Sequence, residues 1–69
     1  MESQEVKIKG WVARDYNGQL AFYPRCPERY GYYWDIDNPN EYMYINNDCF
    51  PELRWENEPI KVEVTIKKM

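Results

Sequence analysis

The stretch EVKIKGWVARDYNGQLAFY, residues 5–23, decides the fold that this sequence predicts. Its first half alternates β-branched and polar residues with a period of two, which is typical of a strand that has one apolar face. The segment DYNG, residues 15–18, then fits a type I turn followed by a glycine in the left-handed conformation, the usual three-residue hairpin loop. We therefore predict an antiparallel hairpin in this stretch.

Two loop lengths fit this hairpin, and they predict different registers. A three-residue loop sets Arg14 opposite Leu20, whereas a two-residue Asn-Gly turn shifts the pairing by one and moves Trp11 to the face of Leu20. We favour the first register because it requires no bulge at Gly10. It predicts one shared apolar face, made of Val6, Ile8, Val12, Leu20 and Phe22.

The stretch YGYYWDIDNPNEYMYINN, residues 30–47, predicts a second hairpin that turns through DNPN, residues 37–40. A four-residue loop there pairs Ile36 with Glu41 and, further out, Tyr33 with Tyr44. One face of this hairpin is predicted to enter the core: Tyr32, Trp34, Ile36, Met43 and Ile45. The other face is polar and aromatic, and it is the candidate partner-binding surface: Tyr33, Asp35, Tyr42 and Tyr44.

The remaining segments complete an all-β prediction. PRCPERYG, residues 24–31, contains two prolines and no alternation, which indicates a loop. NNDCFPEL, residues 46–53, allows a helical turn capped by Asp48 with Phe50 and Leu53 inward, and IKVEVTIKK, residues 60–68, alternates as a final strand. We expect one domain over residues 1–69. It should be a small antiparallel sheet of about five strands, curled or forming a partly open barrel, with room for one short helical turn near 48–53.

Charge is uneven along the chain. The net charge is −3, but residues 30–60 hold seven acidic residues against Arg54 alone, a local charge of −6. A phosphate backbone would be repelled by this region, so ordinary nucleic-acid binding is disfavoured. Nucleic-acid roles that remain open are stacking on single strands and mimicry of DNA by the acidic surface.

The sequence lacks the residues that most enzymes and metal sites need. It has no histidine, the commonest general base, no glycine-rich phosphate loop and no nucleophile elbow. Two widely separated cysteines do not make a zinc site, and the acidic cluster at 35–41 lacks the glycine that a calcium loop needs at its sixth position. We therefore expect no catalysis, no metal and no cofactor.

No apolar run resembles the core of a signal peptide or reaches the roughly 20 residues that cross a bilayer. We therefore expect a cytoplasmic protein without a membrane partner. Its reducing surroundings favour free thiols, although the sequence leaves open whether Cys26 and Cys49 pair.

Tyrosines mixed with acids and asparagines are typical of a protein interface, where rigid rings supply contact area and acids select a basic partner. The leading functional hypothesis is a noncatalytic module that binds an unidentified protein, with a basic surface as the favoured kind. A homo-oligomeric structural protein is the other alternative, because an exposed edge or the tyrosine face can pair with a second copy.

Three motifs resemble a group of small uncharacterised all-β proteins encoded by gut anaerobic bacteria and by their phages or mobile elements. They are GWVARDYNGQL with its Trp-x-x-Arg-Asp pattern, the Pro-x-Arg of CPER, and FPELRWENEPIKVEV with its Phe-Pro-x-x-x-Trp-Glu pattern. The pattern has KPER where this chain has CPER. The resemblance implies an accessory protein that binds a host factor, and it assigns no catalytic or binding residue. From the residues themselves, we expect Trp11 and Trp55 to pack, and Arg14 to make a cation–π contact or to pair with an acid.

Overall fold

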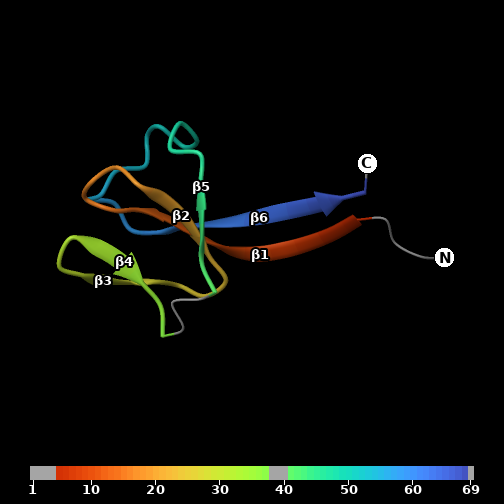
Figure 1. Ribbon diagram of the computed structural model, residues 1–69, viewed down its shortest axis with the longest axis horizontal. Helices are drawn as coiled ribbons and strands as arrows, with labels where there is room; N and C mark the ends of the chain where they lie inside the picture. The colour runs from red at the N-terminus through yellow and green to blue at the C-terminus, as the bar shows by residue number, and fades with distance from the viewer. Residues whose placement is uncertain (1–4, 38–40, 69) are drawn as a thin grey trace.

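The computed structural model describes residues 5–37 and 41–68, and within them the protein is all-β (Figure 1). Four strands form an antiparallel sheet in the order β5-β2-β1-β6, and two form a separate hairpin. The all-β, antiparallel prediction is confirmed, with six strands in place of about five, and the sheet stays open without closing into a barrel. The strands are β1 (Glu5–Arg14), β2 (Leu20–Tyr23), β3 (Glu28–Tyr30), β4 (Tyr33–Asp35), β5 (Met43–Ile45) and β6 (Ile60–Lys67).

The β1–β2 hairpin has the register that a three-residue loop predicts, with Arg14 opposite Leu20. Its turn is closed by two backbone hydrogen bonds, in which the Gly18 N–H donates to the Asp15 carbonyl at 3.0 Å and the Asp15 N–H donates to the Gln19 carbonyl at 2.8 Å. Gly18 has a φ of 93°, a conformation that costs glycine little and other residues much more. Local turn chemistry therefore fixes this part of the sheet.

The pairing of β1 with β6 runs along the whole length of β1, from Glu5 opposite Lys67 to Val12 opposite Ile60. Gly10 adjoins Trp11, where the pairing of β1 with β2 ends, and a Cβ at position 10 would collide with the Phe22 ring and the Tyr23 carbonyl oxygen. The missing side chain thus lets Phe22 pack closely against β1.

The core lies on both faces of the four-stranded sheet. Successive residues of a strand point to opposite faces, so β1 and β2 contribute to two separate clusters. One cluster is covered by the β3–β4 hairpin and contains Ala13, Ala21, Tyr23, Trp34 and Ile36. The other is covered by the segment 46–53 and contains Val12, Leu20, Phe22 and Leu53. Figure 1 shows the hairpin and this segment on either side of the sheet.

The predicted second hairpin is wrong in its pairing. β4 pairs with β3, with Tyr30 opposite Tyr33, and β5 pairs with β2 instead of with β4. Gly31, with a φ of 59°, allows the chain to turn at once, which gives β4 a neighbouring partner and leaves β5 free to extend the sheet. The segment 24–31, predicted as a loop, therefore includes a strand. Trp34 and Ile36 are buried as predicted, whereas Tyr32 and Met43 are exposed.

No helical turn forms at residues 48–53, which is a second correction. The segment instead folds as consecutive turns, with Phe50 in a left-handed conformation at a φ of 50°. Phe50 and Leu53 do point inward, as predicted. The left-handed conformation of Phe50 interrupts a helical path, and the Arg14 guanidinium stabilises the turns by donating to backbone carbonyl oxygens. Its five acceptors are Leu53 at 2.6 Å, Gly18 at 2.8 Å, Cys49 at 3.0 Å, and Asn47 and Phe50 at 3.1 Å.

Candidate protein-binding surface

The β3–β4 hairpin presents a tyrosine-rich tip. It turns through Gly31 and Tyr32, and the positive φ of Gly31 without one at Tyr32 is the pattern of a type II′ turn. Tyr30 and Tyr33 flank this turn as a cross-strand pair. The three tyrosines are exposed, by 43% for Tyr30, 74% for Tyr32 and 50% for Tyr33. The tip therefore offers aromatic surface that the core does not use.

The inward side of this hairpin holds it to the rest of the protein. Arg29 lies opposite Trp34, and its guanidinium carbon is 4.6 Å from the ring centroids of both Trp34 and Trp55. The same guanidinium donates to the Trp55 carbonyl at 2.7 Å. Such cation–π contacts contribute roughly 0.5–2 kcal/mol each. Arg29 thus joins the hairpin to the segment 46–59, a role that the sequence did not reveal.

Two further hydrogen bonds fasten the backbone of Trp34 to the first hairpin. The Trp34 N–H donates to Asp15 Oδ1 at 2.9 Å, and the buried Tyr23 hydroxyl donates to the Trp34 carbonyl at 3.0 Å. Partial burial raises the pKa of Asp15, although the Trp34 N–H opposes that rise. Burial also raises the pKa of Tyr23, with the nearby charge of Asp15 adding to the effect. The hairpin is therefore held in place at its inward side.

The outward side carries four residues that we call the hairpin face: Glu28, Tyr30, Tyr33 and Asp35. The rings of Tyr30 and Tyr33 stack with centroids 6.1 Å apart and planes inclined by 27°. The Tyr30 hydroxyl donates to Glu28 Oε2 at 3.1 Å. This hydrogen bond, together with the charge of Glu28, raises the pKa of Tyr30. The face is thus ordered by its own contacts while it is open to solvent.

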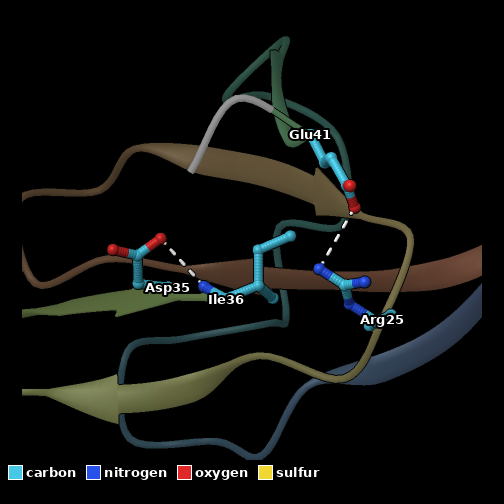
Figure 2. Close-up of polar contacts among 4 residues, drawn as sticks. All are labelled: Arg25, Asp35, Ile36 and Glu41. Atoms are coloured by element: carbon cyan, nitrogen blue, oxygen red, sulfur yellow. Dashed lines mark hydrogen bonds and ion pairs between the residues drawn. The ribbon is translucent and has the colours of Figure 1, made fainter. Parts of the chain in front are cut away.

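Glu28 and Asp35 stand directly opposite each other, a like-charge pair that costs stability in an antiparallel sheet. Within residues 5–37 and 41–68 neither carboxylate takes part in an ion pair. Figure 2 shows that the Asp35 carboxylate instead accepts the backbone N–H of Ile36 at 2.8 Å. Two acids kept together without a cation give this face a negative potential that suits a cationic group.

A small pocket of about 110 Å³ adjoins the hairpin face. Arg25 is at its rim, but the guanidinium points to Glu41, and Nη2 lies 3.2 Å from Glu41 Oε2 (Figure 2). Both side chains are well exposed, so the pair contributes little to stability, yet it offsets the positive charge of Arg25. The pocket is lined by Arg25, Cys26, Glu28, Tyr30, Asp35, Ile36 and Asp37.

Other tyrosines also form ring pairs. Tyr42 and Tyr44 meet edge to face at 5.5 Å, and Tyr42 packs on buried Tyr23 at the same distance. Hydrogen bonding with Tyr44 raises the pKa of Tyr42, and the charge of Asp35 adds to that rise. Tyr16 and Tyr32 form a third pair at 5.2 Å. Tyr42 is partly buried, whereas Tyr44 is exposed on the edge strand β5.

The structure divides the four predicted site residues. Tyr33 and Asp35 share the hairpin face, whereas Tyr42 and Tyr44 belong to the edge of the four-stranded sheet, so the predicted alignment of Tyr33 with Tyr44 is wrong. The charge of Asp35 still reaches Tyr42. Sequence reasoning missed Glu28 and Tyr30, which the turn at YGYY, residues 30–33, could have indicated, because a glycine at its second position fits a two-residue hairpin loop.

The predicted contacts of the tryptophans and of Arg14 form with other residues than expected. Trp55 packs edge to face against Trp34 at 5.9 Å, while Trp11 lies under Lys61, its neighbour across the sheet, at 5.6 Å. Arg14 binds backbone carbonyls in place of a ring or an acid. Trp11 and Trp55 therefore pack in two different places, Trp55 against Trp34 and Trp11 beneath Lys61.

The part of the chain that the structure describes contains no group of three or more acidic or cysteine side chains placed to hold a metal ion. Cys26 and Cys49 are both exposed as free thiols. No helix in the described residues could cross a membrane. Comparison with protein-family models, with curated proteins and with solved structures gives no match. The resemblance to small proteins of gut anaerobes and phages therefore stays a prediction.

Proposed function

We propose that this protein is a noncatalytic binding module whose hairpin face contacts a protein partner with a basic surface. The observation that carries the proposal is the exposed Tyr30–Tyr33 stack flanked by two carboxylates, Glu28 and Asp35, that have no ion-pair partner in the described residues. Tyr44, on the neighbouring sheet edge, extends the proposed surface. The residues proposed from the sequence, Tyr33, Asp35, Tyr42 and Tyr44, thus remain part of it.

Tyrosine suits such a contact because its large ring loses little conformational entropy on binding and its hydroxyl can hydrogen-bond. Here the rings of Tyr30 and Tyr33 already hold each other, so less order has to be gained when a partner binds. A lysine or arginine of the partner would meet both an aromatic face and a carboxylate, which combines a cation–π contact with an ion pair.

A cytoplasmic setting is part of this proposal. It is supported by the free, exposed thiols of Cys26 and Cys49, which suit a reducing compartment. If the resemblance to accessory proteins of bacteria and mobile elements holds, the partner is a host factor.

The proposal is tested by affinity capture from host cytoplasm with matched baits, followed by direct binding of the purified partner. The decisive bait carries Glu28→Gln and Asp35→Asn. Its control carries Asp48→Asn and Glu52→Gln, which changes the net charge equally on the exposed segment 46–53. We expect the first bait to lose the partner and the control to retain it. Equal capture by both baits would refute the hairpin face as the contact surface.

The same experiment tests the alternative of stacking on single strands. A second bait with Tyr30→Ser and Tyr33→Ser removes the stack and keeps the charge, and we expect it to lose the partner as well. Capture is repeated after nuclease treatment and at raised salt. Binding to single strands would fall steeply with salt and vanish with nuclease, whereas a tyrosine-centred protein contact responds modestly to salt. A nuclease-sensitive capture would contradict the proposal.

A further inference from the structure

β1 and β6 extend beyond the rest of the sheet as a two-stranded arm (Figure 1). β2 pairs with β1 only from Trp11 onward, so the arm, residues 5–10 with 62–67, is joined by no third strand from the part of the chain that the structure describes. The molecule is accordingly elongated, with extents of 47 × 26 × 16 Å along its principal axes. An isolated two-stranded ribbon is marginally stable in water, so this arm is where an additional strand would add most.

One side of the arm is apolar and faces solvent. Val6 pairs with Ile66, and both are 55% exposed, while Ile8 pairs with Val64 and is 37% exposed. The sequence predicts that Val6 and Ile8 share the apolar face of Leu20 and Phe22. The face is correct, but no layer of the described chain covers its outer end. The apolar side of the arm thus continues the second core cluster into solvent.

β6 is also an edge strand over its whole length of eight residues. An edge strand presents unpaired backbone N–H and C=O groups, and proteins commonly shield long edges with prolines, bulges or inward-pointing charges. Between Ile60 and Lys67 there is no proline, and the pairing with β1 is regular throughout. The edge is therefore suited to accept another strand.

We propose that β6 pairs with β6 of a second copy, antiparallel and edge to edge, about a two-fold axis at Thr65. The two four-stranded sheets then become one sheet of eight strands. In this register β6 is complementary to itself in charge and in shape. This pairing uses none of the residues of the hairpin face, so it stands independently of the function proposed above.

In this register Glu63 and Lys67 of β6 each meet the opposite charge. Glu63 lies across from Lys67 of the second copy, twice by symmetry, and Val64 lies across from Ile66 on the apolar side. Opposite charges and β-branched pairs across antiparallel strands are each favourable. Thr65 faces its own copy at the axis, where two hydroxyls can hydrogen-bond to each other.

The complementarity continues across all four strands of the joined arms. Within one copy Glu63 lies beside Lys9, and Lys67 lies beside Glu5. The polar side therefore carries a row of alternating charge: Lys9 and Glu63 of one copy, then Lys67 and Glu5 of the second. A second such row follows by symmetry, and no like charges are adjacent in either row.

Other registers that keep the two apolar sides together fit less well. An axis at Glu63 opposes that residue to itself, and an axis at Val64 opposes Lys61 to Lys67, which are both like-charge pairs. An axis at Val62 brings Pro59 into the pairing, where it has no N–H to donate, and so shortens the ladder. The axis at Thr65 pairs residues 62–68 without these faults.

The first test is sedimentation velocity of the full chain over a wide concentration range, with charge-reversed variants. Glu63→Lys alone opposes lysines twice, and Lys67→Glu alone opposes glutamates twice. We expect each variant to weaken self-association about tenfold or more. Mixing the two variants restores both opposite-charge pairs, so the mixture should form a heterodimer about as tight as the unmodified dimer. Arg54→Glu, with the same charge change outside the arm, should dimerise normally.

Circular dichroism and thermal unfolding of each variant establish that it is folded. A monomer at all concentrations would overturn the proposal. So would a dimer that both charge reversals leave intact, or two weakened variants that fail to associate when mixed.

The second test locates the axis by disulfide cross-linking. Cys26 and Cys49 are replaced by serine, and Thr65→Cys is introduced. Residues opposite each other in antiparallel strands have Cα atoms roughly 4.5–5.5 Å apart, which is within the range for a disulfide. Mild oxidation should therefore give a covalent dimer. Lys61→Cys is the matched control, because position 61 lies outside the paired residues 62–68 and the change keeps Glu63 and Lys67, and equal cross-linking of the two variants would overturn the axis at Thr65.

Discussion

Replacing Arg14 with methionine is expected to release the segment 46–53 from the sheet. The guanidinium donates to five backbone carbonyls, and three of these bonds, to Leu53, Gly18 and Phe50, are partly buried. Water can replace the two exposed bonds at little cost. Hydrogen bonds that involve a charged group contribute about 1.5–3 kcal/mol each, and neutral ones about 1 kcal/mol. Taking about 1 kcal/mol for each of the three partly buried bonds, we expect a loss of about 3 kcal/mol in the free energy of unfolding.

This loss is large for so small a protein. Native stabilities of roughly 0.05–0.15 kcal/mol per residue imply about 3–10 kcal/mol for a chain of this length. The measurement is urea denaturation followed by tryptophan fluorescence, because Trp34 and Trp55 both report on the packed interior. Hydrogen exchange of the Leu53 amide, which donates to the Phe50 carbonyl at 2.9 Å, would show whether the segment opens alone or with the whole protein.

Arg14→Lys is the matched control. Lysine keeps the charge and most of the stem, but its three donors lie on one nitrogen and cannot span carbonyls that surround a planar fork. We expect it to recover less than half of the loss. Full recovery by lysine would show that charge alone matters, and a methionine variant within about 0.5 kcal/mol of the parent would refute the bridging role.

Three further outcomes are expected. Gly10→Ala should destabilise the protein by about 1–3 kcal/mol in urea denaturation, because its methyl group meets the Phe22 ring, and an unchanged midpoint would contradict that close approach. Glu28→Gln should lower the pKa of Tyr30 toward its ordinary value in a spectrophotometric titration, since the carboxylate holds the phenol proton. Tyr23 keeps its proton to a higher pH when folded than when unfolded, so its contribution is complete below about pH 10 and declines above it. Tyr23→Phe should flatten this decline, and a slope that persists would assign it to other groups.

What the sequence predicted well is local. The β1–β2 register follows from the turn at residues 15–18, where each position suits its conformation, and β6 follows from uninterrupted alternation. The side of the strand that each residue faces is also set locally. Trp34 points inward while Tyr33 and Asp35 point outward, because neighbours on a strand face opposite sides. Half of the proposed surface was predictable for that reason.

What it did not predict is the choice of partner strand. DNPN at residues 37–40 is a strong turn signal, and it suggested that β4 and β5 pair, but a glycine at position 31 offered a shorter connection. Both pairings satisfy the same alternation, and the packing of Trp34 against Arg29 and Trp55 adds to the short turn at Gly31 in favouring the observed one. The hydrogen-bond acceptors of Arg14 and Arg29 could not be predicted either. They are backbone carbonyls that come into position only when the chain folds.

The pairing of β1 with β6 has a kinetic consequence. The longest ladder in the sheet joins segments near opposite ends of the chain, so a large loop must close before any of its contacts form. Folding speed falls as contacts become more distant in sequence, which makes this closure the expected slow step. During synthesis the β1–β2 hairpin can form early, but its outer flank has to wait for residues 60–67. In a circular permutant that links residue 68 to residue 5, β6 and β1 would be adjacent in sequence and could pair as a local hairpin. The change in its refolding rate would measure how much of the folding barrier comes from closing this loop.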